Sequence, residues 1–355
     1  MRPLIATINL NHLRDNFRLL KHTHGNKMYA VVKADAYGHG AIRCSQALID
    51  DADGFAVAFL EEAYQLRQND IQKPIVLLEG VFNPEEYAEC ERFNFSPVIQ
   101  NQVQLNDFLN YNWKKPVNIW LKLDTGMRRA GFFPDDYKKA YAVLSKQKYV
   151  ENIVKMTHFA CADDLNSDFT NHQIKIFDDT TCGLGKISSI ANSAGILAHN
   201  KTHRDIGRAG IALYGISPFE DTNEFSGKLK PVMTLTTKVF GERILRQGEA
   251  VGYGSIFRAD KDMRIGLIAC GYADGYPRVP SNDNPVLIDG KLSRVIGRVS
   301  MDMMTVELND STQGIGSTVE LWGENISVAE IAKRCGTISY EILCHLKRAK
   351  MVYCE

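Results

Sequence analysis

Between residues 27 and 206, short apolar segments alternate with longer segments whose apolar residues recur at helical spacing. Strands that alternate with helices pair in parallel, because each helix carries the chain back to the edge where the next strand starts. Eight such units are what a closed (β/α)8 barrel requires, although a doubly wound sheet shares the pattern. We predict strands near residues 27–32, 54–58, 74–78, 96–99, 117–123, 153–158, 186–191 and 203–206.

Beyond Pro231 the sequence changes character. Strand-like stretches are separated by Gly, Asp and Pro, which are typical of turns between antiparallel strands. We therefore predict an α/β protein, with an N-terminal TIM-like (β/α)8 barrel in residues 1–230 and a mostly antiparallel β domain in residues 231–355. An opening strand near residues 4–8 is a candidate for pairing with the second domain. A capping box, Ser327-x-x-Glu330, marks the start of one helix in that domain.

The composition excludes several classes of partner. Lys and Arg number 42, as do Asp and Glu, so the formal net charge is zero, and no basic stripe suggests nucleic acid or anionic membrane. The start lacks the long apolar core of a signal peptide and no apolar run is long enough to span a membrane, so we expect a cytoplasmic protein. The eight cysteines are dispersed, with no C-x-x-C pair and no histidine at zinc spacing, which predicts reduced thiols and no metal site.

Lys33 follows an apolar run, Lys27 to Val32, that we expect to be a buried strand. A buried ammonium group is costly unless it is paired, neutral or covalently bound. A lysine whose pKa is lowered by burial can hold an aldehyde cofactor as a Schiff base. A lone lysine beside a glycine-rich turn is more often a surface residue, but the closely following Tyr37, Gly38 and Gly40 favour a functional role.

Polar residues recur where the predicted strands end. In a barrel these ends meet at one mouth, which is where such enzymes carry out their chemistry. Taken singly, each has a structural explanation: His158 could be a core histidine, and Asn192 with Ser193 could cap a helix. The residues concerned are Lys33, Lys122, Asp124, Arg129, His158, Asn192, Ser193, Arg208 and Gly210.

A phosphate would fit this mouth. Ser193 and the Gly210-Ile211 segment are predicted to open helical or turn segments with free backbone N–H groups, and Tyr37 adds a hydroxyl. The chain has neither a Walker loop nor a dinucleotide fingerprint, so the phosphate would belong to a small cofactor.

The run Ala30-x-x-Lys33-Ala34-Asp35-Ala36-Tyr37-Gly38-His39-Gly40 resembles the pyridoxal-phosphate attachment signature of the bacterial alanine racemase family. The resemblance implies that Lys33 carries the cofactor, that Arg208 faces its pyridine nitrogen and that His158 stacks on its ring. Arg129 matches the arginine that serves the substrate carboxylate, and Lys122 matches a lysine that is carbamylated in some members. The residues that match the phosphate-binding group are Tyr37, Ser193, Gly210, Ile211 and Tyr353.

The resemblance extends into the second domain. Val251-Gly252-Tyr253-Gly254 is similar to the segment that holds the second catalytic base, which makes Tyr253 that base. The segments around Tyr272 and Met301 match the active-site entrance and the substrate-binding residues. In the family, these segments come from the other subunit of a head-to-tail homodimer. Ser300 departs from the pattern, since many members have cysteine there, and the tail from Lys347 to Tyr353 is only loosely similar.

The implied activity is the interconversion of L-alanine and D-alanine, which supplies D-alanine for peptidoglycan. Racemisation needs one base on each face of a planar carbanion, and the resemblance assigns Lys33 to the D-enantiomer and Tyr253 to the L-enantiomer. Arg208 would leave the pyridine nitrogen unprotonated, because a guanidinium does not give up its proton. The cofactor would then be a weaker electron sink, which favours racemisation over transamination.

Three alternatives remain open from the sequence. A racemase for serine or for a broader range of amino acids would share this scaffold. A decarboxylase of the same architecture commonly has a glutamate facing the pyridine nitrogen, so Arg208 and Tyr253 speak against it. A cofactor carrier or homeostasis protein resembles the barrel but lacks the β domain, which would leave the residues beyond Pro231 unexplained.

Overall fold

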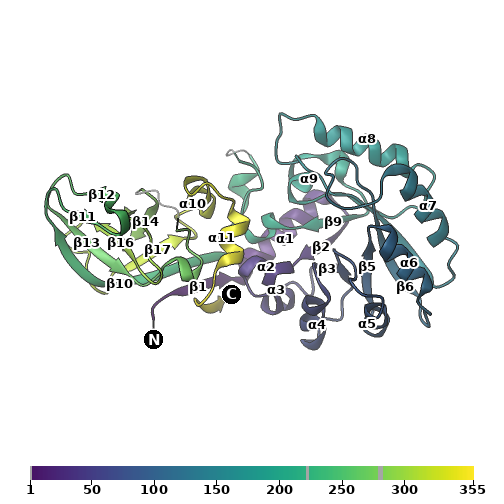
Figure 1. Ribbon diagram of the computed structural model, residues 1–355, viewed down its shortest axis with the longest axis horizontal. Helices are drawn as coiled ribbons and strands as arrows, with labels where there is room; N and C mark the ends of the chain where they lie inside the picture. Colours follow the sequence, from purple (N-terminus) through teal and green to yellow (C-terminus); the bar gives the residue numbers. More distant parts are fainter. Residues whose placement is uncertain (1, 221–223, 279–282) are drawn as a thin grey trace. The chain divides into compact units, whose positions relative to one another are not determined.

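The computed structural model describes residues 2–220, 224–278 and 283–355. It contains two compact units (Figure 1). One is Leu13–Leu229, which we call the barrel unit. The other, which we call the β unit, combines the residues up to His12 with Lys230–Glu355. The predicted fold class, a TIM-like barrel followed by a mostly antiparallel domain, is confirmed, and the doubly wound alternative is wrong.

The barrel unit is built on an eight-stranded parallel sheet. Most of the strands are buried along nearly their whole length, as expected where helices cover the outside of a parallel sheet, whereas Val150–Met156 is buried only over its last three residues. The first and last strands in sequence, β2 (Lys27–Val31) and β9 (Ile206–Ala209), are hydrogen-bonded neighbours, and at the remaining edge Arg208 N donates to Ala191 O at 3.1 Å. In order along the sheet the strands are β8 (Ser188–Ser189), β7 (Val150–Met156), β6 (Val117–Lys122), β5 (Phe95–Ile99), β4 (Ile75–Leu77), β3 (Gly54–Val57), β2 (Lys27–Val31) and β9 (Ile206–Ala209).

The last barrel strand lies three residues later than predicted, at Ile206–Ala209 instead of 203–206. Glycine and arginine within the strand make it a poor match to an apolar pattern. A Cβ at Gly207 would lie 2.8 Å from Met28 Cε on the neighbouring strand, so a larger residue there would displace the Met28 side chain. Arg208 is consequently inside the strand rather than beyond its end, and its guanidinium is buried.

Helices follow most of the barrel strands. Helix α1 (Leu10–His24) buries Leu13, Phe17 and Leu20, which lie at helical spacing, and Asn9 caps it by accepting from His12 N at 3.0 Å. The other helical segments are α2 (Lys33–Gly38), α3 (Ala41–Ala47), α4 (Leu60–Gln68), α5 (Glu86–Phe93), α6 (Gln102–Asn110), α7 (Pro134–Leu144), α8 (Phe169–Thr181), α9 (Ser193–Ala198), η1 (Asn200–Thr202), η2 (Ile211–Tyr214) and η3 (Ser226–Lys228).

The β unit contains a second eight-stranded sheet, antiparallel except where β1 and β18 pair. Buried and exposed residues alternate along β10, so one face of that strand packs on the core. The order is β13 (Met263–Ile268), β16 (Met304–Leu308), β15 (Lys291–Ile296), β14 (Pro285–Ile288), β17 (Thr318–Trp322), β10 (Met233–Leu245), β1 (Ile5–Asn9) and β18 (Lys350–Cys354). A hairpin and short helices complete it: β11 (Ala250–Val251), β12 (Phe257–Arg258), η4 (Tyr253–Ser255), η5 (Tyr272–Asp274), α10 (Val328–Arg334) and α11 (Ser339–His345).

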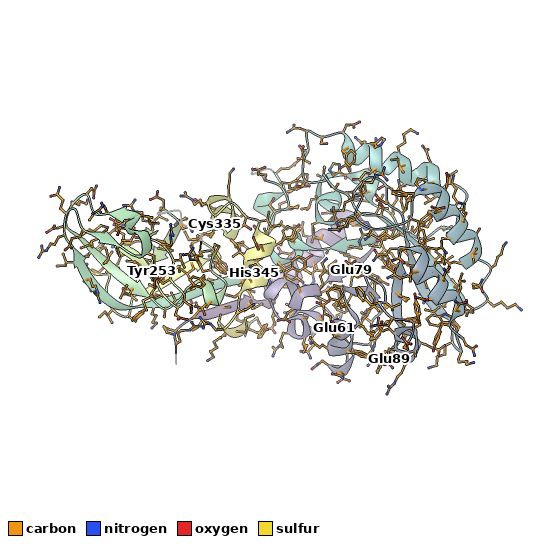
Figure 2. The ribbon with its side chains drawn as sticks, in the orientation of Figure 1. Glu61, Glu79, Glu89, Tyr253, Cys335 and His345 are labelled. Atoms are coloured by element: carbon orange, nitrogen blue, oxygen red, sulfur yellow. The ribbon has the colours of Figure 1, made fainter. Side chains whose placement is uncertain are left out.

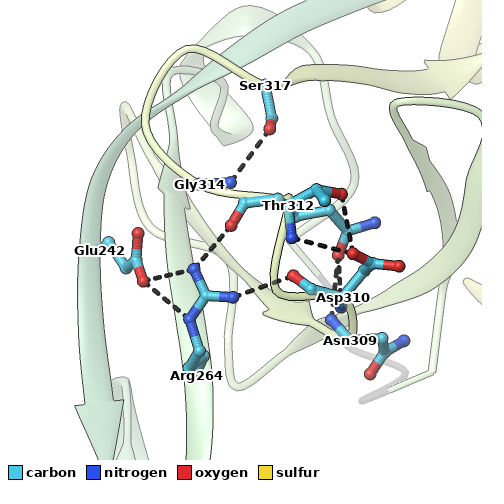
Figure 3. A network of polar contacts seen from close by, with 8 residues as sticks. Glu242, Arg264, Asn309, Asp310, Thr312, Gly314 and Ser317 are labelled. Carbon is cyan, nitrogen blue, oxygen red and sulfur yellow. Dashed lines mark hydrogen bonds and ion pairs between the residues drawn. The ribbon is translucent and has the colours of Figure 1, made fainter.

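Two polar details of the β unit illustrate how its turns are held. Arg264 on β13 donates to Glu242 on β10 and to the carbonyl oxygens of Asp310 and Gln313, which fastens the turn between β16 and β17 (Figure 3). Helix α10 starts where the capping pattern predicts, with Ser327 Oγ accepting from Ala329 N at 3.2 Å. Its partner in the pattern, Glu330, pairs with Arg334 one turn later, so the reciprocal half of the capping box is not formed.

Two buried histidines of the barrel unit should make the fold sensitive to acid. Burial lowers the pKa of His24 and of His39 to about 4, and neither ring nitrogen of His24 has a hydrogen-bond partner among the described residues. Between pH 6.5 and 4 the unfolded chain binds protons that the folded chain excludes, so stability falls as the pH falls. We expect about 2 kcal/mol lost per histidine between pH 7.5 and pH 5.

Urea unfolding at the two pH values measures this loss. The variant His24→Leu should have a smaller pH dependence than the parent, whereas His22→Leu, at an exposed position on the same helix, should leave it unchanged. An equal pH dependence in the parent and in His24→Leu would show that His24 is not one of the groups responsible.

Candidate active site

Arg208 is the centre of the polar cluster at the carboxyl ends of the barrel strands. It is only 4% exposed. Nη1 donates to Ser189 O at 2.7 Å and to Ser189 Oγ at 2.8 Å, and Nη2 donates to Thr157 O at 2.8 Å. Burial lowers the pKa of Arg208 to about 10, which still leaves the guanidinium protonated at neutral pH. A fixed cation therefore lies at the ends of β7 and β8.

His158, which follows β7, is next to this guanidinium. Its Nδ1 lies 3.4 Å from Arg208 Nη2. Burial, followed by the charges of Arg208, Arg129, Lys122 and Lys33, holds the pKa of His158 well below its usual range. The ring is therefore neutral at physiological pH, which suits an aromatic surface for stacking better than a proton donor.

Lys122, the last residue of β6, adds a second buried amine. Its Nζ donates to Gln100 Oε1 at 3.4 Å. Burial lowers the pKa of Lys122 to about 8; nearby Glu79 opposes this, and Arg129 adds to it. Arg129 itself is exposed on the loop after β6, and it lines a small hollow together with Lys122, Met127, Thr157 and His158. The strand ends thus collect cations, which predicts an anionic occupant.

A cradle suited to a small anion lies at the start of η2. Ser193 Oγ accepts from the N–H groups of Gly210 and Ala212, at 3.1 and 3.2 Å, so its own proton remains available to a ligand. A Cβ on Gly210 would lie 3.3 Å from Tyr37 Oη and 3.5 Å from Ser193 Oγ. The structure therefore brings these three predicted residues together, and Ile211 begins η2 directly after them. The Gly210 N–H, expected to be free, is instead bonded to Ser193.

The turn that carries Lys33 is left-handed. Ala34, Asp35, Ala36 and Tyr37 all have φ between 51° and 54°, which costs about 1–2 kcal/mol per residue for L-amino acids. Contacts to neighbouring elements hold it. Glu62 Oε1 on α4 accepts from Ala34 N at 2.7 Å, and the Tyr37 ring packs on Tyr214 with ring centroids 4.9 Å apart. Strain of this kind persists only where the surroundings enforce it, and it concentrates at functional sites.

Lys33 is half-buried, not fully buried as the apolar run suggested. The strand ends at Val31, so Lys33 lies two residues beyond it, directly before the left-handed turn. The side chain can therefore reach a molecule bound at the mouth. Its charge contributes to the low pKa values of both His158 and Lys122, which places it in the same cluster.

The remaining predicted site residues lie in the β unit. Tyr253 begins η4 and is 68% exposed (Figure 2). Tyr272 and Met301 are held together, because Tyr272 N donates to Ser300 O and Ala273 N donates to Met301 O, both at 3.0 Å. Both side chains are exposed. Tyr353 lies on β18, paired with Ile8 of β1.

Asp274, in the predicted entrance segment, anchors the part of the chain that carries Tyr272. This fully buried carboxylate accepts from Gly271 N and forms ion pairs with Arg2 and Arg348. Other contributors were missed in the barrel unit, namely Thr157, Ser189, Gln173 and Glu62. Gln173 is a polar residue on the buried face of α8, among apolar neighbours such as Ile174 and Phe177.

In the described residues, no helix is both long enough and apolar enough to cross a membrane. No disulfide joins the eight cysteines, all of which lie in the described part of the chain.

Comparison with known proteins gives matches over almost the whole chain. Residues 8–218 match the model of the alanine racemase N-terminal domain, and residues 232–353 match that of the C-terminal domain. An alanine racemase of Neisseria gonorrhoeae is 54% identical over 355 residues, with 100% of both chains covered. The crystal structure of the biosynthetic alanine racemase from Pseudomonas aeruginosa aligns with a TM-score of 0.97 and 43% identity, covering 100% of each chain.

A further relative concerns the cofactor. The crystal structure of alanine racemase from Bartonella henselae with covalently bound pyridoxal phosphate aligns with a TM-score of 0.90 and 30% identity, again over 100% of each chain. Family models on both halves, full-length relatives and matching structures all agree with the resemblance found in the Lys33 segment. The chain therefore belongs to the alanine racemase family of isomerases.

Proposed function

We propose that the protein interconverts L-alanine and D-alanine with pyridoxal phosphate bound at the mouth of the barrel unit. The observation that carries this proposal is the buried Arg208, which is fixed by carbonyl oxygens at the ends of two strands and lies beside a neutral His158. The names of the full-length relatives support the reaction. The product D-alanine would serve peptidoglycan synthesis, in the cytoplasm.

The residues at the mouth fit this cofactor. Gly210 keeps the space beside the hydroxyl groups of Tyr37 and Ser193 open, since a Cβ there would lie 3.3 Å and 3.5 Å from their oxygens, and the Ser193 hydroxyl can still donate to a phosphate. Ile211 follows in the same segment, and Tyr353 is the proposed further donor. The surrounding cations match a group with several negative charges. When bound, the cofactor withdraws electrons from the Cα–H bond of the substrate, and Lys33 would hold it covalently.

Arg208 sets the outcome of the reaction in this proposal. A guanidinium with a pKa of about 10 remains protonated at neutral pH, so Arg208 would donate a hydrogen bond to the ring nitrogen without giving up a proton. The cofactor would then be a weaker electron sink. Reprotonation at Cα, which is racemisation, is favoured over reprotonation elsewhere.

Two side chains would move the proton. Lys33 would take or give it on the face of the D-enantiomer, and Tyr253 of the partner subunit on the face of the L-enantiomer. The exposure of Tyr253 leaves its hydroxyl accessible to a second copy of the chain. A tyrosine ordinarily ionises near pH 10, so it needs nearby cations to accept a proton at neutral pH, and Arg208 is one candidate. In this proposal the protein is therefore a homodimer, in which each active site contains residues of both chains.

Arg129 would bind the substrate carboxylate, with Met301 beside the substrate and Tyr272 at the entrance, both again from the partner subunit. The Arg129 guanidinium is exposed at the hollow that Lys122 and His158 line, so it is accessible to a small acid. Lys122, with a pKa of about 8, is partly neutral at physiological pH, as carbamylation would require.

Proton NMR of L-alanine in heavy water, followed together with optical rotation, tests this function. Loss of the α-proton signal with rotation falling to zero is the expected result. Exchange of the α-proton while the optical rotation is retained would mean that only one of the two bases works. Failure to exchange alanine, followed by exchange of serine, would assign a different substrate, and failure with both would favour a cofactor carrier.

Replacing Arg208 tests the control of reaction type. We expect Arg208→Glu to slow racemisation and to raise transamination, because a carboxylic acid would protonate the ring nitrogen and strengthen the electron sink. Transamination is measured as pyruvate formed from alanine. The control is Arg92→Glu, at an exposed position on α5. Unchanged rates of both reactions in Arg208→Glu would remove this role for Arg208.

A further inference from the structure

We infer that Gln173, on α8, is a positioning residue for racemisation that fixes the two loops carrying Arg129 and His158. The inference rests on the proposed function, because it assigns a role at the same site. Gln173 does not line the hollow beside Arg129 or the anion cradle at Gly210. Its side chain is completely buried.

The amide group of Gln173 ties α8 to both loops. Nε2 donates to Thr125 Oγ1 at 3.0 Å, in the loop after β6, and to His158 O at 3.2 Å, in the segment after β7. Oε1 accepts from Ala160 N at 2.9 Å. The Gln173 side chain thus bonds to the backbone of His158 and Ala160, which flank Phe159. It also bonds to Thr125, in the loop that leads to Arg129. In a buried setting, each of these groups would be costly to leave unpaired.

The hydrogen bonds continue from Thr125 to the centre of the site. Thr125 Oγ1 lies 2.8 Å from Thr157 Oγ1, and Thr157 Oγ1 donates to Leu123 O at 2.9 Å. The carbonyl oxygen of the same Thr157 accepts from Arg208 Nη2 at 2.8 Å. Both threonines are 1% exposed. Gln173 is therefore linked through a buried hydrogen-bond network to the Arg208 guanidinium, which the proposed function places opposite the cofactor ring.

Helix α8 also packs closely against the loop after β6. Gly126 has a φ of 150°, and a Cβ there would lie 2.9 Å from Phe169 Cζ and 3.4 Å from Gln173 Cγ. The loop therefore has little freedom to move toward the helix, where Phe169 and Gln173 both pack against it. Without its amide, the loop could shift, and Arg129 would shift with it. A displacement of about 1 Å at a reacting group can cost a hundredfold in rate.

The test compares Gln173→Met with Thr170→Val. The methionine keeps the length and the packing but removes all three hydrogen bonds. Thr170 is the matched control, because it is equally buried one turn earlier on α8, and its Oγ1 has no hydrogen-bond partner among the described residues. Gln173→Glu is a second variant in case the first does not fold, since it keeps an acceptor for Ala160 N and loses both donors.

Three readouts are taken on the cofactor-loaded protein: the visible circular dichroism of bound pyridoxal phosphate, kcat and KM for each enantiomer, and the melting temperature. We expect Gln173→Met to change the dichroism of the cofactor, to lower kcat by about tenfold or more and to raise KM, with Thr170→Val like the parent. A lower melting temperature with unchanged dichroism, kcat and KM would overturn the inference, as would the same changes in Thr170→Val.

The two proposals fail in different ways. If the parent protein does not racemise alanine, the proposed function is wrong, and the dichroism of the bound cofactor still reports whether Gln173 positions His158 against it. If the parent racemises alanine and neither Gln173 variant alters the dichroism or the kinetic constants, the inference alone is wrong.

Discussion

The Lys33→Ala variant is expected to lose racemase activity by at least about 10³-fold, because one substitution removes both the covalent attachment of the cofactor and the base for one face. The left-handed turn delivers Lys33 to the mouth and its backbone is held by Glu62, so the alanine variant should keep its fold. Activity is measured as the conversion of L-alanine to D-alanine, and cofactor attachment as the visible absorption of protein-bound pyridoxal phosphate.

Lys27→Ala is the matched control, since Lys27 lies exposed at the other end of the same strand, β2. It should retain both the absorption and the activity of the parent. Retention of more than a tenth of the activity by Lys33→Ala, with cofactor still attached, would show that another amine holds the cofactor. Lys122 would then be the first residue to examine, because its lowered pKa makes it a nucleophile near neutral pH.

The Tyr253→Phe variant is expected to slow α-proton exchange of L-alanine by 10²- to 10⁴-fold, roughly the contribution of one general base. D-alanine should still exchange its α-proton at Lys33, but with its optical rotation retained. The loss is expected to fall on one enantiomer because each base serves one face. Heavy-water NMR on the two enantiomers, run separately, measures it. Tyr340→Phe, an exposed tyrosine on α11 in the same unit, is the control.

Mixing the two inactive variants tests whether Tyr253 acts across a dimer. In a mixed dimer, the Tyr253→Phe chain supplies Lys33 and the Lys33→Ala chain supplies Tyr253, so one of the two sites is complete. Random re-association of equal amounts should restore about a quarter of the parent activity. No recovery of activity, in a mixture shown to exchange subunits, would mean that Tyr253 does not serve the partner's site.

In the NMR experiment on Tyr253→Phe alone, an equal loss of α-proton exchange for both enantiomers would mean that Tyr253 is not a face-specific base.

Much of the fold could be predicted because its signals are local. Strand and helix alternate along residues 27–206, and a right-handed crossover between parallel strands leaves few topologies for such a pattern. The opening helix follows in the same way from Leu13, Phe17 and Leu20. The last barrel strand was misplaced because its Gly207 and Arg208 are accepted for reasons that lie on other strands, namely the close approach of Met28 and the carbonyl oxygens of Ser189 and Thr157.

The sequence by itself determined the type of fold, the family and the types of side chain at the strand ends, since each depends on residue identity and spacing along the chain. Only the tertiary structure decided the left-handed turn after Lys33, the double hydrogen bond that Ser193 accepts from the η2 segment and the network through Gln173. These depend on which groups from distant segments meet when the chain folds. There an unpaired polar group or a strained backbone is tolerated only if its neighbours compensate for it.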